Sequence, residues 1–204
     1  MELHLIRHGQ TNWNEERRAQ GQSESKLTKK GKEQALALKE KISHITFDQI
    51  FCSSSLRTRQ TAELIFPNQA LNIEYLDSLK EIFLGSWEGR LYKDIEVANP
   101  ESHNHFWEEP HLFDLRGAET FYQLQERAVS TVQKIAKNST SKKVVIVSHG
   151  ALIKSLLCDA ERKPIKELWS PPRMHNCAHS IIVYKKETPQ KILQYADVPY
   201  KQLG

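Results

Sequence analysis

Short apolar runs alternate along the chain with segments in which apolar residues recur at spacings of three and four. The runs predict β-strands at residues 3–7, 47–52, about 72–76, 142–150, about 180–184 and about 190–196. The spaced pattern predicts helices that follow Thr28, cover about 55–66, begin just after Gly117 and follow Gly150. The helix after Gly117 is the most regular, with apolar residues at Phe121, Leu124, Ala128, Val132 and Ile135.

This order of elements predicts a fold class. The run KKVVIVSHG at 142–150 is continuous and β-branched, as expected for a strand buried on both faces. Strands that alternate with helices predict an α/β three-layer sandwich, with a mostly parallel central sheet and helices on both faces. The length of 204 residues suits a single domain over residues 1–204. Within it, the turn-rich stretch at about 85–117 is expected to form a lid-like helical insertion, with short helices at about 91–98 and 101–108.

Two of the predicted strands end in a histidine followed by a glycine. Arg7-His8-Gly9 ends the first strand, and Ser148-His149-Gly150 ends the buried one. Ligands of open α/β sheets bind at the carboxyl ends of the strands, so both imidazoles are expected at one edge. Arg57 follows the second strand, which places its side chain at the same edge. A phosphoryl group needs cationic and N–H donors and an in-line nucleophile, so the pattern predicts a phosphate site.

These residues also allow other interpretations. A lone histidine is more often a capping or core residue than a nucleophile. A tyrosine-phosphatase loop requires five residues between its Cys and Arg, but four separate Cys52 from Arg57, so Cys52 is expected in the core. The stretch HNHFWEEPH at 103–111 superficially suggests a metal site. It contains no His-Glu-x-x-His helix and is interrupted by proline, so neither a metal nor another cofactor is expected.

Composition excludes several classes of partner. The chain carries 29 Lys+Arg and 25 Asp+Glu, a net charge of +4, and its lysine pairs are scattered, so no nucleic acid is expected. Its apolar runs are too short for a membrane span or a signal sequence. The three cysteines lack Cys-x-x-Cys spacing, which favours reduced thiols in a cytoplasmic protein. The expected partner is a small phosphate monoester, and the expected state is a monomer or weak homodimer.

Five motifs occur in the order typical of one family. LIRHGQTNWN, SSSLRTRQTAE, LKEIFLGSWEGR, GAETF and VIVSHG resemble the histidine phosphatase superfamily, in its phosphoglycerate mutase-like branch. NHFWEEPHLF and the later LWSPP further resemble the cytoplasmic broad-specificity phosphatases of bacilli. The resemblance implies a phosphoglycerate mutase-like fold and a metal-independent phosphomonoesterase that acts through a phosphohistidine.

The same resemblance implies a role for each site residue. His8 is the nucleophile, Glu81 protonates the leaving oxygen, and the phosphate oxygens are held by Arg7, Arg57 and His149. The remaining phosphate- and substrate-binding positions are Gly9, Gln10, Thr11, Asn14, Gln20, Gly21 and Gly150. Physical chemistry agrees with two of these roles. Attack requires neutral His8, whose pKa the neighbouring arginines lower, and an alkoxide leaving group needs a nearby acid. By position alone, after Lys80, a surface glutamate is the default interpretation of Glu81.

The aromatic residues of the middle segment allow two interpretations. Trp87, Phe106 and Trp107 either form a small subsidiary core or form an apolar wall that selects esters with organic alcohol parts. Two departures from the family pattern bear on specificity and leave the His/Arg core untouched. Gly117-Ala118-Glu119-Thr120 replaces Gly-Gly-Glu-Ser, and Glu24-Ser25-Lys26-Leu27-Thr28 replaces Asp-x-Pro-Leu-Thr beside the substrate mouth.

Three functions therefore remain in order of preference. A phosphomonoesterase comes first. A phosphoglycerate mutase comes second, because true mutases of this branch carry additional segments that close the site. A non-catalytic phospho-ligand binding module comes third, because the complete set of expected catalytic residues is present.

Overall fold

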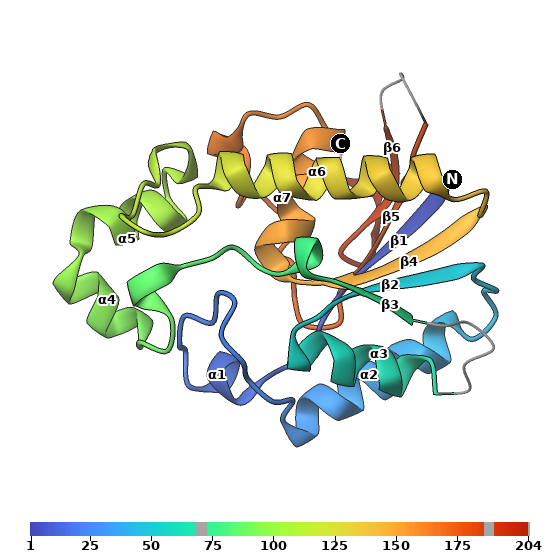
Figure 1. The fold of residues 1–204 in the computed structure, drawn as a ribbon, viewed down its shortest axis with the longest axis horizontal. Coiled ribbons are helices and arrows are strands. Elements are labelled where there is room, and N and C mark those ends of the chain that lie inside the picture. The colour runs from blue at the N-terminus through green and yellow to red at the C-terminus, as the bar shows by residue number, and fades with distance from the viewer. Residues whose placement is uncertain (68–72, 186–189, 204) are drawn as a thin grey trace.

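A twisted sheet with strand order β3-β2-β4-β1-β5-β6-β7 forms the centre of the computed structural model, which describes residues 1–67, 73–185 and 190–203 (Figure 1). The strands are β1 (Glu2–Arg7), β2 (Gln49–Ser53), β3 (Ile73–Leu76), β4 (Lys143–Ser148), β5 (His179–Val183), β6 (Lys191–Tyr195) and β7 (Val198–Pro199). The sequence pattern therefore located six of these seven described strands and missed the two-residue β7. Residue 72, where the third strand was expected to begin, lies outside the described residues.

The sheet is parallel at its core and antiparallel toward one edge. β3, β2, β4 and β1 pair in parallel, whereas β5, β6 and β7 pair antiparallel to their neighbours. β5 runs against β1 because the chain approaches it at the carboxyl end of β1, where the amide of Arg7 donates to the carbonyl of Ala178. The segment before β5 therefore passes directly over the carboxyl edge of the sheet.

Helices cover both faces of the sheet, as Figure 1 shows. α2 (Lys29–Ile42) and α3 (Leu56–Ile65) lie on one face, and α6 (Phe121–Asn138) and α7 (Gly150–Ala160) lie on the other. β4 explains why both faces must be covered. Its side chains alternate between the two apolar clusters, with Val145 and Val147 facing α2 and α3, and Val144 and Ile146 facing α6 and α7.

The segment at 85–117 extends the molecule beyond the carboxyl ends of the parallel strands. It contains α4 (Tyr92–Ala98) and α5 (Pro100–Trp107), close to the two short helices that the sequence predicted. Its buried residues Trp87, Ile95, Phe106 and Phe113 belong to the same apolar cluster as α6 and α7. The short 3-10 helices of the described chain are Asp77–Leu79, Gly85–Trp87, Pro110–Leu112, Ile165–Glu167 and Tyr200–Gln202.

α1 (Asn12–Glu15) is a helix that the hydrophobic pattern did not predict. At four residues it is too short to show a helical period, and a capping box forms it instead. The Thr11 hydroxyl accepts from the amide of Asn14 at 3.1 Å, and the Asn14 side chain accepts from the amide of Thr11 at 3.1 Å. None of the helices in the described ranges is long and apolar enough to cross a lipid bilayer.

Candidate active site

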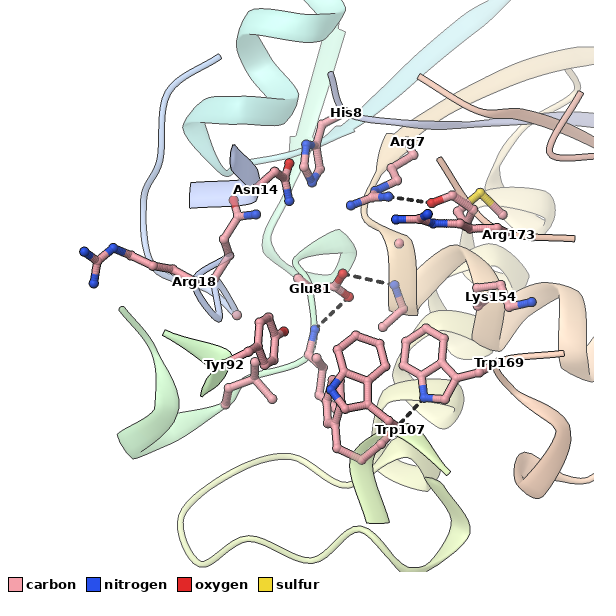
Figure 2. Close-up of a pocket in the computed structure, with 18 of the residues that line it drawn as sticks. Arg7, His8, Asn14, Arg18, Glu81, Tyr92, Trp107, Lys154, Trp169 and Arg173 are labelled. Atoms are coloured by element: carbon pink, nitrogen blue, oxygen red, sulfur yellow. Dashed lines mark hydrogen bonds between the residues drawn. The ribbon is translucent and has the colours of Figure 1, made fainter. Parts of the chain in front are cut away.

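A pocket of about 640 Å³ opens at the carboxyl ends of the parallel strands (Figure 2). Parallel β1 and β4 end level with each other, because Arg7 of β1 pairs with Ser148 of β4. His8 and His149 therefore follow at adjacent positions, as the sequence predicted. The predicted residues that line the pocket are Arg7, His8, Asn14, Gln20, Gly21, Arg57, Glu81, Phe106, Trp107 and Gly150.

His8 is held in the tautomer that suits a nucleophile. Its Nδ1 lies 2.8 Å from the carbonyl oxygen of Gly9, which only accepts hydrogen bonds, so Nδ1 carries the proton. Nε2 then carries the lone pair, and Figure 2 shows the ring directed into the pocket between Asn14 and Arg7. Burial, with the charges of Arg57 and Arg7, holds the His8 pKa well below its usual value. The imidazole is therefore neutral at physiological pH.

Two arginines border this imidazole, Arg57 buried and Arg7 half-buried. Arg57 is 1% exposed, and its guanidinium donates to the carbonyl oxygens of Ser23 at 2.8 Å and Gly21 at 2.7 Å. Arg7 donates to the carbonyl oxygen of Met174. Burial lowers the pKa of Arg57 to about 10, which leaves it protonated.

Buried polar atoms without a partner gather at this site. Of the four such side-chain atoms in the described ranges, three belong to the predicted phosphate-binding set: Nε of Arg7, Nε of Arg57 and Nδ1 of His149. An unsatisfied buried donor costs about 1–3 kcal/mol. An anion at this position would relieve part of that cost and balance the positive charges of Arg7 and Arg57.

His149 lies against His8 but does not line the pocket. The two ring centroids are 5.4 Å apart at an interplanar angle of 62°. The His149 Nε2 is 2.8 Å from the Ser53 hydroxyl, and the side chain is fully buried. Burial, followed by the charge of Arg57, holds the His149 pKa well below its usual value. This imidazole therefore packs against His8 and not against the pocket.

Glu81 contacts the N-terminus of α7. Its Oε2 accepts from the amide of Ala151 at 3.0 Å, and its Oε1 accepts from those of Leu152 at 3.1 Å and Ile82 at 3.0 Å. The first amides of a helix have no intrahelical partner, so a carboxylate is a favourable ligand for them. Glu81 also lies at the pocket wall, so the carboxylate is fixed beside the position of the substrate.

Three residues predicted to bind phosphate make structural contacts in this protein. Gly9, Gln10 and Thr11 do not line the pocket. A Cβ on Gly9 would lie 2.4 Å from the carbonyl oxygen of Gly31, so glycine is needed here for the close approach to α2. The amide of Gln10 donates to Gln34, and Thr11 caps α1.

The other predicted glycines shape the arginines' surroundings. Gly21 has a φ of +51° and presents its carbonyl to Arg57. A Cβ on Gly150 would lie 3.3 Å from the Nε of Arg7, so glycine leaves room for that guanidinium. Gln20 lines the pocket while its side-chain oxygen accepts from Thr11 at 2.9 Å.

The pocket also contains residues that the sequence did not predict. They are Arg18, Ile82, Leu84, Tyr92, Glu108, Ala151, Lys154, Trp169, Pro171, Arg173 and Met174. Arg173 is exposed beside Arg7 in Figure 2 and makes no hydrogen bond or ion pair through its side chain to any other described residue. The buried amine of Lys154 points away from the pocket and donates to the carbonyl of Ser170, which holds the loop that carries Arg173. This loop has no hydrophobic period, so the sequence offered no signal beyond the motif LWSPP.

Some of the aromatic residues of the middle segment form a buried core, and others form an apolar wall of the pocket. Trp87 is fully buried against Phe106 and Phe113 and does not line the pocket, so its assignment to the pocket was wrong. Trp107 is 38% exposed and forms a wall with Tyr92 and Trp169, at ring-centroid distances of 5.4 and 5.3 Å. Phe106 belongs both to the buried core and to the pocket wall, since it is 3% exposed and still lines the pocket.

Comparisons with known proteins agree on the family. A family model described as histidine phosphatase superfamily (branch 1) matches residues 3–197. A solved structure of Bacillus stearothermophilus YhfR has a TM-score of 0.93 and 36% identity, over 98% of each chain. Phosphoserine phosphatase 1 of Hydrogenobacter thermophilus is 29% identical over 83% of this chain and 81% of its own. A probable phosphoglycerate mutase of Salmonella choleraesuis is 28% identical over 91% of this chain and 86% of its own.

Proposed function

Because the chain belongs to the histidine phosphatase superfamily (branch 1), we propose that it hydrolyses small organic phosphate monoesters with His8 as the nucleophile. One observation carries the proposal. A neutral imidazole presents its free Nε2 between two guanidinium groups whose buried Nε atoms lack partners. This arrangement is complementary to a phosphate that is attacked in line.

The reaction proceeds through these atoms in two steps. His8 Nε2 attacks phosphorus, a P–N bond forms, and the P–O bond to the alcohol breaks. The alcohol oxygen leaves with a proton, for which Glu81 at the pocket wall is the proposed donor. Water then attacks phosphorus and gives a proton to the Glu81 carboxylate, the P–N bond breaks, and inorganic phosphate, neutral His8 and protonated Glu81 are regenerated.

Arg7 and Arg57 contribute charge to both steps. Their guanidinium groups neutralise the charge on the oxygens of the transferring phosphoryl group. The contact between His8 Nδ1 and the Gly9 carbonyl stabilises the positive charge that develops on the ring. These side chains, Glu81 and one water molecule account for both steps.

The alcohol part of the substrate would meet two kinds of surface. The wall of Tyr92, Trp107 and Trp169 favours apolar or aromatic groups, and the free guanidinium of Arg173 favours a carboxylate. The substrate class that we propose is a small monoester whose alcohol part is apolar or carries a carboxylate. A phosphoserine phosphatase among the relatives supports the second of these.

The test is phosphate release from a panel of monoesters in the presence of a chelator. The panel contains aryl phosphates, phosphoserine, 3-phosphoglycerate and glycerol phosphate. We expect His8→Ala to abolish turnover while circular dichroism stays unchanged, and we expect the control His44→Ala, at an exposed position, to keep full activity. Undiminished turnover in His8→Ala would overturn the nucleophile assignment.

The same panel separates the rival functions. A mutase interconverts 3- and 2-phosphoglycerate faster than it releases phosphate, since a second hydroxyl replaces water as the acceptor. A binding module does neither and retains affinity for phosphate. Either result in the wild-type protein would replace the hydrolase proposal.

The cytoplasm remains the proposed location. Cys52, Cys158 and Cys177 are free and buried in the described structure, which suits a reducing compartment. Fractionation of cells that express the tagged full chain tests this, and recovery outside the cytoplasmic fraction would contradict it.

A further inference from the structure

The segment 78–81 ends at Glu81, and the side chain of Arg127 binds three of its carbonyl groups. Arg127 of α6 donates from Nη1 to the carbonyl oxygens of Ser78 at 2.9 Å and Lys80 at 2.8 Å. Its Nη2 donates to the carbonyl oxygen of Glu81 itself at 3.2 Å. A segment with little regular structure is thus fixed to a long helix by one guanidinium group.

Glu119 completes this connection on the other side of Glu81. Its carboxylate binds Arg127 through two bonds, Nε to Oε1 at 2.8 Å and Nη2 to Oε2 at 2.7 Å. Its Oε2 also accepts from the amide of Phe83 at 3.1 Å, and its own amide donates to the Phe83 carbonyl at 2.8 Å. The pair of Arg127 and Glu119 therefore holds the chain both before and after Glu81.

The geometry requires arginine at this position. All three guanidinium nitrogens are engaged, in five hydrogen bonds that diverge toward a carboxylate and three carbonyl groups. A lysine amine has three donors at one point and cannot span these acceptors. A partly buried ion pair loses hydration, so it is favourable only when its other donors are satisfied, as they are here.

We propose that Arg127 and Glu119 are positioning residues for proton donation by Glu81. The inference rests on the proposed function, because it assigns a role within that reaction. The backbone of Glu81 is fixed to α6 by Arg127, while its carboxylate is fixed to the N-terminus of α7. Loss of the α6 contacts displaces the acid relative to the leaving oxygen and leaves His8 in place.

The test compares two esters that differ in their need for an acid. An aryl phosphate such as p-nitrophenyl phosphate releases a stable phenolate, whereas an alkyl phosphate such as glycerol phosphate needs protonation. We expect Arg127→Lys and Glu119→Gln to lower kcat for the alkyl ester at least tenfold more than for the aryl ester. In a Glu81→Gln background, Arg127→Lys is expected to add no further selective loss. Lys134→Gln, on the exposed face of α6, is the matched control and should leave both rates unchanged.

A purely structural role gives a different result. In that case the two substitutions lower both rates equally, or they lower the melting temperature and leave the ratio of the two rates unchanged. Either outcome would overturn the proposal. If Arg127→Lys does not fold, Glu119→Gln decides the question, since it keeps the size of the side chain and weakens only the pair. Wild-type protein that hydrolyses neither ester would instead overturn the proposed function.

Discussion

Trp107 offers a way to separate substrate preference from folding. The side chain is 38% exposed, and its partners Tyr92, Phe106 and Trp169 lie at ring-centroid distances of 5.4, 4.8 and 5.3 Å. Its open face is available to an aromatic alcohol group. One aromatic pair contributes about 0.5–1.5 kcal/mol, so Trp107→Ala should lower kcat/KM for naphthyl phosphate roughly two- to twelvefold.

Phe106 provides the matched comparison. It is 3% exposed and packs against Trp87, Phe113 and Phe121, so its truncation leaves a cavity in the core. We expect Phe106→Ala to cost about 3–5 kcal/mol of unfolding free energy, whereas Trp107→Ala costs much less.

Steady-state kinetics with naphthyl phosphate and glycerol phosphate, together with urea unfolding, measures both effects. For Trp107→Ala the loss should fall on KM for the naphthyl ester, because the ring binds ground state and transition state alike. Equal losses on the two esters, or a loss confined to kcat, would refute the assignment of Trp107 to the substrate wall.

Two further predictions concern pH and packing. Burial and the two arginines hold the pKa of His8 well below 6.5, so its neutral, nucleophilic form persists as the pH falls. The acid limb of kcat/KM should therefore lie below pH 6.5, and a limb at or above that value would contradict this environment for His8. A Cβ on Gly31 would lie 2.0 Å from the carbonyl oxygen of Gln10, and neither backbone can move without disturbing the loop after β1. Gly31→Ala should therefore cost about 1–3 kcal/mol by urea unfolding, and an unchanged midpoint would refute the close approach.

The core of the site could be predicted because it depends on regular structure. A strand followed by His-Gly occurs twice, and parallel strands end at a common edge, so pattern alone brings His8 and His149 together. Arg57 follows by the same argument from β2. These predictions need only strand direction and position, both of which hydrophobic runs indicate.

Predictions failed where three-dimensional packing decides the outcome. The close contact of Gly9 with Gly31 of α2 was not predicted, because it joins segments far apart in sequence. Trp87 was assigned to the pocket, but it is buried in the core. Arg173 was missed because its loop is placed by the Lys154 amine and by Arg7, and neither contact leaves a periodic signal.

The structure divides the pocket into a rigid part and an open part. His8 and Arg57 are almost fully buried, and their orientation is fixed by backbone carbonyl groups. Trp107 and Arg173, which would meet the alcohol part, are exposed and lie on the segment 85–117 and on the loop before β5. A substitution in the buried set leaves a charge or a donor unpaired, which is costly, whereas a change in the exposed set alters contacts at little cost in stability. Phosphoryl chemistry is therefore tied to the sheet, and specificity can vary without disturbing it.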